Sequence, residues 1–173
     1  MYPLHLDLNE EQALFAETAR KLIEWRSPLS AVRARAEEGA GLDRAQWRRQ
    51  AELGWLGLLV PESSGGGCLT GSGVLDLTIV AAELGRLVQP GPVLPAALVA
   101  AALGAEGSGA HAGLLAGILG GDVVATWCAP DARRWWDGRA DVIATRGDGD
   151  VVLDGVARYV PDAQEADVLL VCA

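Results

Sequence analysis

Apolar residues recur at helical spacing through the first part of the chain, and capping residues mark where the helices begin. Asn9 can cap a first helix, with Gln12 three positions later to complete a capping box. Asp43 stands in the same relation to Gln46 and predicts a second capped helix. Gly54 follows that helix as a natural terminator. The pattern therefore predicts amphipathic helices from the ninth residue onward.

The later helices are predicted to be more deeply buried than the first. Residues 74–88 are apolar on most of a helical surface, which is typical of a helix buried on several sides. Two Ala- and Leu-rich segments, 94–103 and 110–119, predict two further buried helices. In the helix that follows Asp43, Trp47 occupies a position predicted to face inward.

The pattern changes at Gly120-Gly121, where helical spacing gives way to β-branched and aromatic runs. Helices followed by strands predict an α+β protein with a boundary near residue 120. The Asp148-Gly149 pair is a strong hairpin signal between two of the strands. The predicted strands are residues 123–128, 140–145, 151–156 and 168–171. Because so few strands leave open edges, we expect a continuation of the chain or a partner to cover them.

Composition and charge narrow the class of protein. The chain has 173 residues, half of them hydrophobic, which predicts a packed core, and its net charge of −9 argues against non-specific nucleic-acid binding. The longest apolar stretch, residues 93–105, falls short of the roughly 20 residues that cross a bilayer. Residues 1–11 lack the basic region of a signal peptide. Cys68, Cys128 and Cys172 are far apart and predict reduced thiols. These features predict a cytoplasmic protein that does not span a membrane.

The residues alone assign no catalytic or metal site, because no His, Cys or acidic spacing matches a known motif. Gly65-Gly66-Gly67 resembles part of a phosphate loop but lacks the lysine that follows one, so a mobile loop is favoured. Trp135-Trp136 is interpreted as packing against a sheet edge or a partner, with an aromatic wall beside a planar ligand as the alternative. Five arginines cluster within residues 33–49 of the sequence, and we interpret them as a solvated helix face with i,i+4 ion pairs. A binding site for an anionic ligand is the less favoured alternative. The arginines are Arg33, Arg35, Arg44, Arg48 and Arg49.

Several segments, taken in order, resemble the N-terminal half of the acyl-CoA dehydrogenases. Together they cover nearly all of the chain, and their order and spacing are more specific than any one of them. These segments are Leu8 to Phe15, Leu53 to Glu62 with Gly65-Gly66, Val80 to Arg86, Gln89 to Pro95, Asp148 to Gly155, and Arg158 to Asp167.

The resemblance implies a fold and an activity. The family oxidises the Cα–Cβ bond of acyl-CoA thioesters, with a carboxylate that removes the α-proton and an FAD that accepts the β-hydride. Its fold is a helical domain, a middle β-barrel-like domain and a C-terminal helical bundle, assembled as dimers or tetramers. Residues 1–120 are thus expected to form the helical domain, and residues 121–173 the beginning of an antiparallel β-barrel-like middle domain. The bundle and the catalytic Glu are expected beyond Ala173, so we expect the chain alone to be inactive.

Two segments align with flavin contacts of the family. The Thr-Glu-Pro-x-Ala-Gly-Ser strand and loop aligns with residues 125–132, where Cys128 replaces the Thr that hydrogen-bonds the flavin and the Gly-Ser is missing. The Trp-Ile-Thr segment aligns with residues 159–161, where Pro161 has neither the hydroxyl nor an N–H. The candidate FAD-contacting residues implied by the resemblance are Trp127, Cys128, Pro130, Tyr159, Val160 and Pro161.

Two functions stay open at this stage. The first is part of an FAD-dependent acyl-CoA dehydrogenase that acts on an acyl-CoA substrate. The second is a non-catalytic subunit with a degenerate flavin site that supports an active partner in a heteromer. The altered flavin segments favour the second, and both predict a homo- or hetero-oligomer of acyl-CoA dehydrogenase-type subunits. A helical interaction module unrelated to the family is a third, less favoured interpretation.

Overall fold

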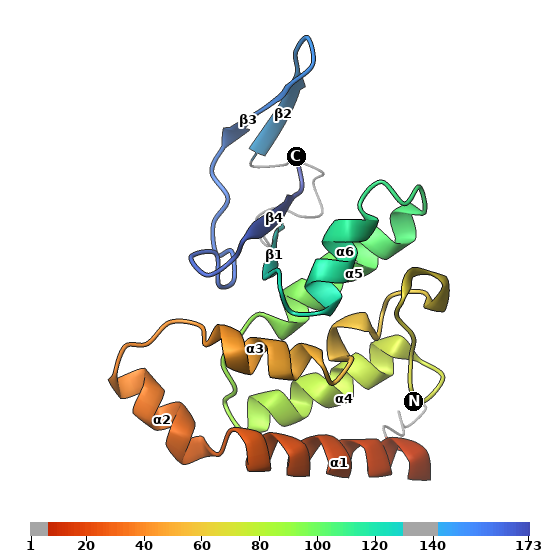
Figure 1. Cartoon of the computed structure of the whole chain (residues 1–173), viewed down its shortest axis with the longest axis vertical. Coiled ribbons are helices and arrows are strands. Elements are labelled where there is room, and N and C mark those ends of the chain that lie inside the picture. The colour runs from red at the N-terminus through yellow and green to blue at the C-terminus, as the bar shows by residue number, and fades with distance from the viewer. Residues whose placement is uncertain (1–6, 130–141) are drawn as a thin grey trace, which may run out of the picture.

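The computed structural model describes residues 7–129 and 142–173, and in these ranges helices come first and strands follow (Figure 1). The predicted helical part followed by strands is thus confirmed. The helices are α1 (Glu10–Arg26), α2 (Leu29–Glu37), α3 (Arg44–Ala51), α4 (Gly73–Arg86), α5 (Val93–Glu106) and α6 (Ala112–Leu119), with 3-10 turns η1 (Trp55–Gly57) and η2 (Glu62–Ser64). The strands are β1 (Ala125–Cys128), β2 (Val142–Arg146), β3 (Val151–Gly155) and β4 (Val168–Val171).

The predicted caps are present at the starts of α1 and α3. The side chain of Asn9 accepts a hydrogen bond from the Gln12 N–H at 2.9 Å, and the Gln12 side chain accepts one from the Asn9 N–H at 3.0 Å. Asp43 accepts from the N–H groups of Ala45 and Gln46. Each cap satisfies backbone donors that have no partner within the helix, so these residues determine where the helices begin.

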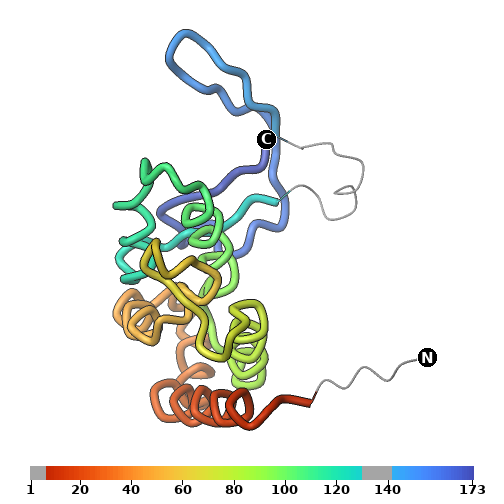
Figure 2. Tube along the Cα trace, turned by 90° about the vertical axis from the view of Figure 1, so that its right-hand side faces the viewer, coloured from red at the N-terminus to blue at the C-terminus, as the bar shows by residue number. Residues whose placement is uncertain are grey.

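The core lies where α5 meets η1, α6 and β1, while α1 packs against α4. Figures 1 and 2 show α1 and α4 at the end of the molecule opposite the strands. Alanines such as Ala96 and Ala100 are fully buried on α5 and allow neighbouring elements to approach closely. Trp47 is 1% exposed, as predicted, and its indole N–H has no hydrogen-bond partner within the described part of the chain. No helix of the described ranges combines the length and the apolar character that a membrane span requires.

Helix α4 buries two of the polar residues that interrupt its apolar surface. Asp76 is 0% exposed; its carboxylate accepts hydrogen bonds from the Leu69 N–H at 2.6 Å, the Thr70 N–H at 3.0 Å and the Thr70 hydroxyl. Glu83 is also buried and accepts two hydrogen bonds from the Arg20 guanidinium of α1, at 2.8 and 2.9 Å. The Asp76 carboxylate thus fastens the glycine-rich loop, residues 65–72, to α4, and the Glu83 carboxylate joins α4 to α1.

The strands form two separate pairs. β2 and β3 are antiparallel around the predicted Asp148-Gly149 turn, and this hairpin projects away from the helices (Figure 1). β1 and β4 pair in parallel, from Ala125 with Val168 to Cys128 with Val171. The predicted antiparallel arrangement therefore holds for the hairpin alone, and the two two-stranded sheets of the described residues do not form a barrel. A parallel pair requires a long connection, and the hairpin lies within the connection between β1 and β4.

Candidate functional site

The two segments predicted to contact a flavin lie next to each other. Thr126, in β1, is fully buried, and its hydroxyl donates a hydrogen bond of 2.7 Å to the carbonyl oxygen of Pro161. The backbone N–H groups of Asp167 and Val168 both donate to the carbonyl oxygen of Val124, which holds the chain after Pro161 along the start of β1. The structure thus brings residues 125–128 and 159–161 together, although more than thirty positions separate them in the sequence.

Trp127 and Cys128, at the end of β1, make different contacts. The half-buried Trp127 donates its indole N–H to the Cys172 sulfur at 3.1 Å. Cys128 is 4% exposed, and its carbonyl oxygen accepts the Cys172 N–H at 3.2 Å. Burial raises the pKa of the Cys128 thiol, and the neighbouring Cys172 raises it further. Cys128 is therefore a buried, protonated thiol and not a reactive thiolate.

The other candidate residues lie on a strained turn. Tyr159 is 86% exposed and has a φ of +58°, and Asp162 has a φ of +48°. Between them Val160 is half-buried and Pro161 is exposed. Non-glycine residues in the left-handed region are uncommon, and such strain often accompanies functional sites.

Two further expectations fall on residues 130–141, which lie outside the described residues. These are the alignment of Pro130 with the flavin loop and the packing of Trp135-Trp136.

A single carboxylate joins the helical part to both strands of the parallel pair. The Arg44 guanidinium, on α3, donates to the two oxygens of Asp167 at 2.5 and 3.0 Å, and to the carbonyl oxygen of Glu165 at 2.9 Å. Asp167 also accepts the Val124 N–H at 2.8 Å. Val124 directly precedes β1 and Asp167 directly precedes β4, so this contact sets the position of both strands on the helices. The hydrogen bond from Arg44, helped by that from Val124, lowers the pKa of Asp167.

We expect substitution of this contact to loosen the strands before the helices. Arg44→Ala removes both hydrogen bonds to Asp167, so deuterium uptake at Val124 and along β1 should rise while uptake in α1 and α4 stays unchanged. The pKa of Asp167 is lowered on folding, so its ionised carboxylate stabilises the folded chain above about pH 4, near the usual Asp value. This stabilisation is lost as the pH falls through the lowered pKa.

Arg48→Ala is the matched control for this exchange experiment. Arg48 pairs with Asp122 through more exposed side chains, and we expect a smaller effect on the same amides. Equal uptake at Val124 in the wild type and in Arg44→Ala would contradict the role assigned to Arg44.

The arginine cluster has a different role from the one predicted. Arg44 pairs with Asp167 and Arg48 with Asp122, both far away in the sequence, while Arg35 pairs with Asp43 at 3.2 Å. The prediction of i,i+4 pairs was wrong for these three arginines, because their side chains extend to other elements and not along their own helix. Thr126 and Asp167 were also not identified as contact residues, since no pattern in the sequence marks which polar side chain will be buried.

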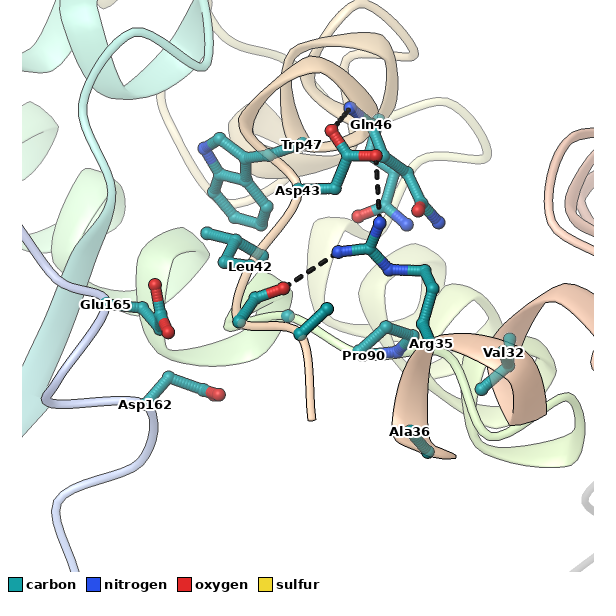
Figure 3. A pocket seen from close by; sticks show the side chains of 14 residues that line it. Val32, Arg35, Ala36, Leu42, Asp43, Gln46, Trp47, Pro90, Asp162 and Glu165 are labelled. Carbon is teal, nitrogen blue, oxygen red and sulfur yellow. Dashed lines mark hydrogen bonds and ion pairs between the residues drawn. The ribbon is translucent and has the colours of Figure 1, made fainter. Parts of the chain in front are cut away.

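A cavity of about 270 Å³ lies between α2, α3 and the turn that precedes β4 (Figure 3). On one side, Arg35 donates to Asp43 and to the carbonyl oxygen of Gly41. On the other side lie the carboxylates of Asp162 and Glu165. Because its one guanidinium is already paired and carboxylates face it, this cavity does not favour the anionic ligand considered as the alternative for the arginine cluster.

The comparisons with known proteins identify the family. The sequence model of the acyl-CoA dehydrogenase N-terminal domain matches residues 9–116. The chain therefore belongs to the acyl-CoA dehydrogenase family, as the resemblance of its segments indicated.

Two curated relatives carry the same name. Acyl-CoA dehydrogenase IpdE2 of Mycolicibacterium smegmatis is 36% identical over 97 residues, which are 56% of this chain and 30% of the relative. IpdE2 of Mycobacterium tuberculosis is 36% identical over 95 residues, or 54% of this chain and 29% of the relative. The chain thus matches about a third of the length of these relatives.

Solved structures of two complexes share the fold over 95% of this chain. A variant of the Tcur3481-Tcur3483 steroid ACAD is 28% identical with a TM-score of 0.74, and the match covers 45% of that chain. The ChsE4-ChsE5 complex from Mycobacterium tuberculosis is 24% identical with a TM-score of 0.75, and the match covers 44% of that chain. The second likeness is evidence for the fold alone.

Proposed function

We propose that this chain is the N-terminal part of a subunit in a hetero-oligomeric acyl-CoA dehydrogenase. Residues 1–120 would be its helical domain and residues 121–173 the start of its middle β domain. The observation that carries the proposal is the match of the family model to residues 9–116, joined by the likeness of 95% of the chain to the Tcur3481-Tcur3483 structure. The assembly would introduce a double bond between Cα and Cβ of an acyl-CoA thioester.

In such an assembly, the site that the family uses for its flavin would lie beside residues 125–128 and 159–161 of this chain. The hydrogen bond between Thr126 and Pro161 joins the two segments that the resemblance aligns with flavin contacts, so both segments border the same place in the fold. FAD, when bound in such an assembly, supplies the acceptor for the β-hydride. The steroid ACAD among the similar structures favours an acyl group attached to a steroid as the substrate class. The cytoplasmic location stays a prediction from the sequence.

The test uses the natural protein that contains these residues, purified through an affinity tag on this subunit. Reduction of an electron-accepting dye is measured with a steroid acyl-CoA and with a straight-chain acyl-CoA. We expect dye reduction that depends on acyl-CoA, is faster with the steroid substrate, and co-purifies with a second, non-identical subunit. A preparation without acyl-CoA-dependent reduction, or an active one made of this subunit alone, would contradict the proposed function.

A further inference from the structure

The chain's own contacts already use two side-chain hydrogen-bond donors of β1. A bound flavin is held and tuned by hydrogen bonds to its ring nitrogens, so a site for it must present unpaired donors. The Trp127 indole N–H is directed to the Cys172 sulfur at 3.1 Å. The Thr126 hydroxyl is directed to the Pro161 carbonyl oxygen at 2.7 Å. These two donors are therefore occupied within the chain, and the third side-chain donor of the strand is the Cys128 thiol, a weaker donor than a hydroxyl.

The face of β1 that carries Cys128 is also covered. Side chains at i and i+2 of a strand share a face, so Thr126 and Cys128 point the same way. Thr126 is fully buried and Cys128 nearly so, and the segment containing Pro161 lies against this face. A planar ring could reach the Cys128 sulfur only by displacing the groups that bury it.

The second segment offers no replacement for these donors. Pro161 has no backbone N–H, and its carbonyl oxygen already accepts the Thr126 hydroxyl. Tyr159 presents its ring to solvent and could stack on the face of a planar ligand. Stacking alone supplies no hydrogen bond to the polar atoms at the edge of a flavin ring. Within the described residues, the positions aligned with flavin contacts therefore do not fit the cofactor.

We infer that the flavin segments of this chain are closed on each other and hold no FAD, so that the partner subunit carries the flavin of the assembly. This inference rests on the proposed function and adds to it the location of the cofactor. Cys172 and Thr126 act as positioning residues, since they hold Trp127 and the Pro161 segment in the closed arrangement.

The test counts flavins in the natural complex. The complex is incubated with excess FAD, desalted and denatured, and the released flavin is compared with the number of subunits. We expect half as many flavins as subunits. A heteromer with acyl-CoA-dependent activity and a flavin on every subunit would overturn this inference alone, whereas a homo-oligomer with a flavin on every subunit would overturn the proposed function as well.

Substitution tests whether the missing hydroxyl and N–H groups keep the flavin from this subunit. Cys128→Thr combined with Pro161→Thr restores the family's hydroxyl groups and, at position 161, the backbone N–H. We expect this double variant to raise the flavin count up to twofold. Cys68→Thr replaces an exposed cysteine on the glycine-rich loop and should leave the count unchanged. A double variant that assembles with an unchanged subunit composition and gains no flavin would overturn the role given to Cys128 and Pro161.

Discussion

Trp47→Ala should lower the free energy of unfolding by about 3–5 kcal/mol, the range for removing a buried large aromatic side chain. Trp47 is almost completely buried in the cluster of buried side chains that joins α3 to α4, α5 and η1. Its ring also packs near Gly91, where an added Cβ would lie 3.6 Å from the indole. The cavity left by alanine would therefore lie inside the core, and urea unfolding followed by circular dichroism measures the loss.

Two further variants serve as controls for the effect of Trp47→Ala. Trp25→Ala removes a tryptophan that is 78% exposed on α1, and we expect a change within about 0.5 kcal/mol. Trp47→Phe should cost less than Trp47→Ala, because it leaves a smaller cavity and removes the indole N–H that has no partner in the described part of the chain. Similar losses for Trp25→Ala and Trp47→Ala would mean that Trp47 does not belong to the core.

Asp76→Ala should lower the free energy of unfolding by about 2–3 kcal/mol, in the range for hydrogen bonds to a charged group. The substitution removes the acceptor for three hydrogen bonds from Leu69 and Thr70. The glycine-rich loop should then detach from α4 and become sensitive to protease, while the remaining helices keep their protection. Limited proteolysis and urea unfolding together measure the local and the global effect.

The charge of Asp76 gives this prediction a pH dependence. Burial by itself raises the pKa of Asp76, but the hydrogen bonds from Thr70 and Leu69 outweigh it and hold the pKa below its usual value. A carboxyl group with a pKa lowered on folding stabilises the protein above about pH 4 and loses this effect as the pH falls through the lowered value. Asp76→Asn keeps one acceptor and should flatten this part of the stability profile. A wild-type loop that resists protease equally at pH 7 and pH 3 would argue against a charged Asp76.

The local signals in the sequence were sufficient for the helices and the hairpin. The caps at Asn9 and Asp43 and the Asp148-Gly149 turn depend on residues only a few positions apart, so the sequence contains the whole interaction. The same holds for Trp47, whose inward position follows from helical spacing.

Contacts between distant segments could not be predicted in the same way. The burial of Asp76 and Glu83 depends on partners that the glycine-rich loop and α1 supply. The helical pattern of α4 alone therefore did not predict that these two polar residues are buried. The pairing of Arg44 with Asp167 and the parallel alignment of β1 with β4 likewise arise only once the chain has folded. For the candidate site, the resemblance supplied two segments, and the structure added the Thr126 hydroxyl that joins them.

The most direct test of the account is native mass spectrometry of the natural complex, which reports subunits and bound flavins in one spectrum. We predict two kinds of subunit and half as many flavins as subunits, with no flavin retained by this subunit when the complex dissociates in the gas phase. A complex that contains only this subunit, with one flavin on each copy, would contradict it.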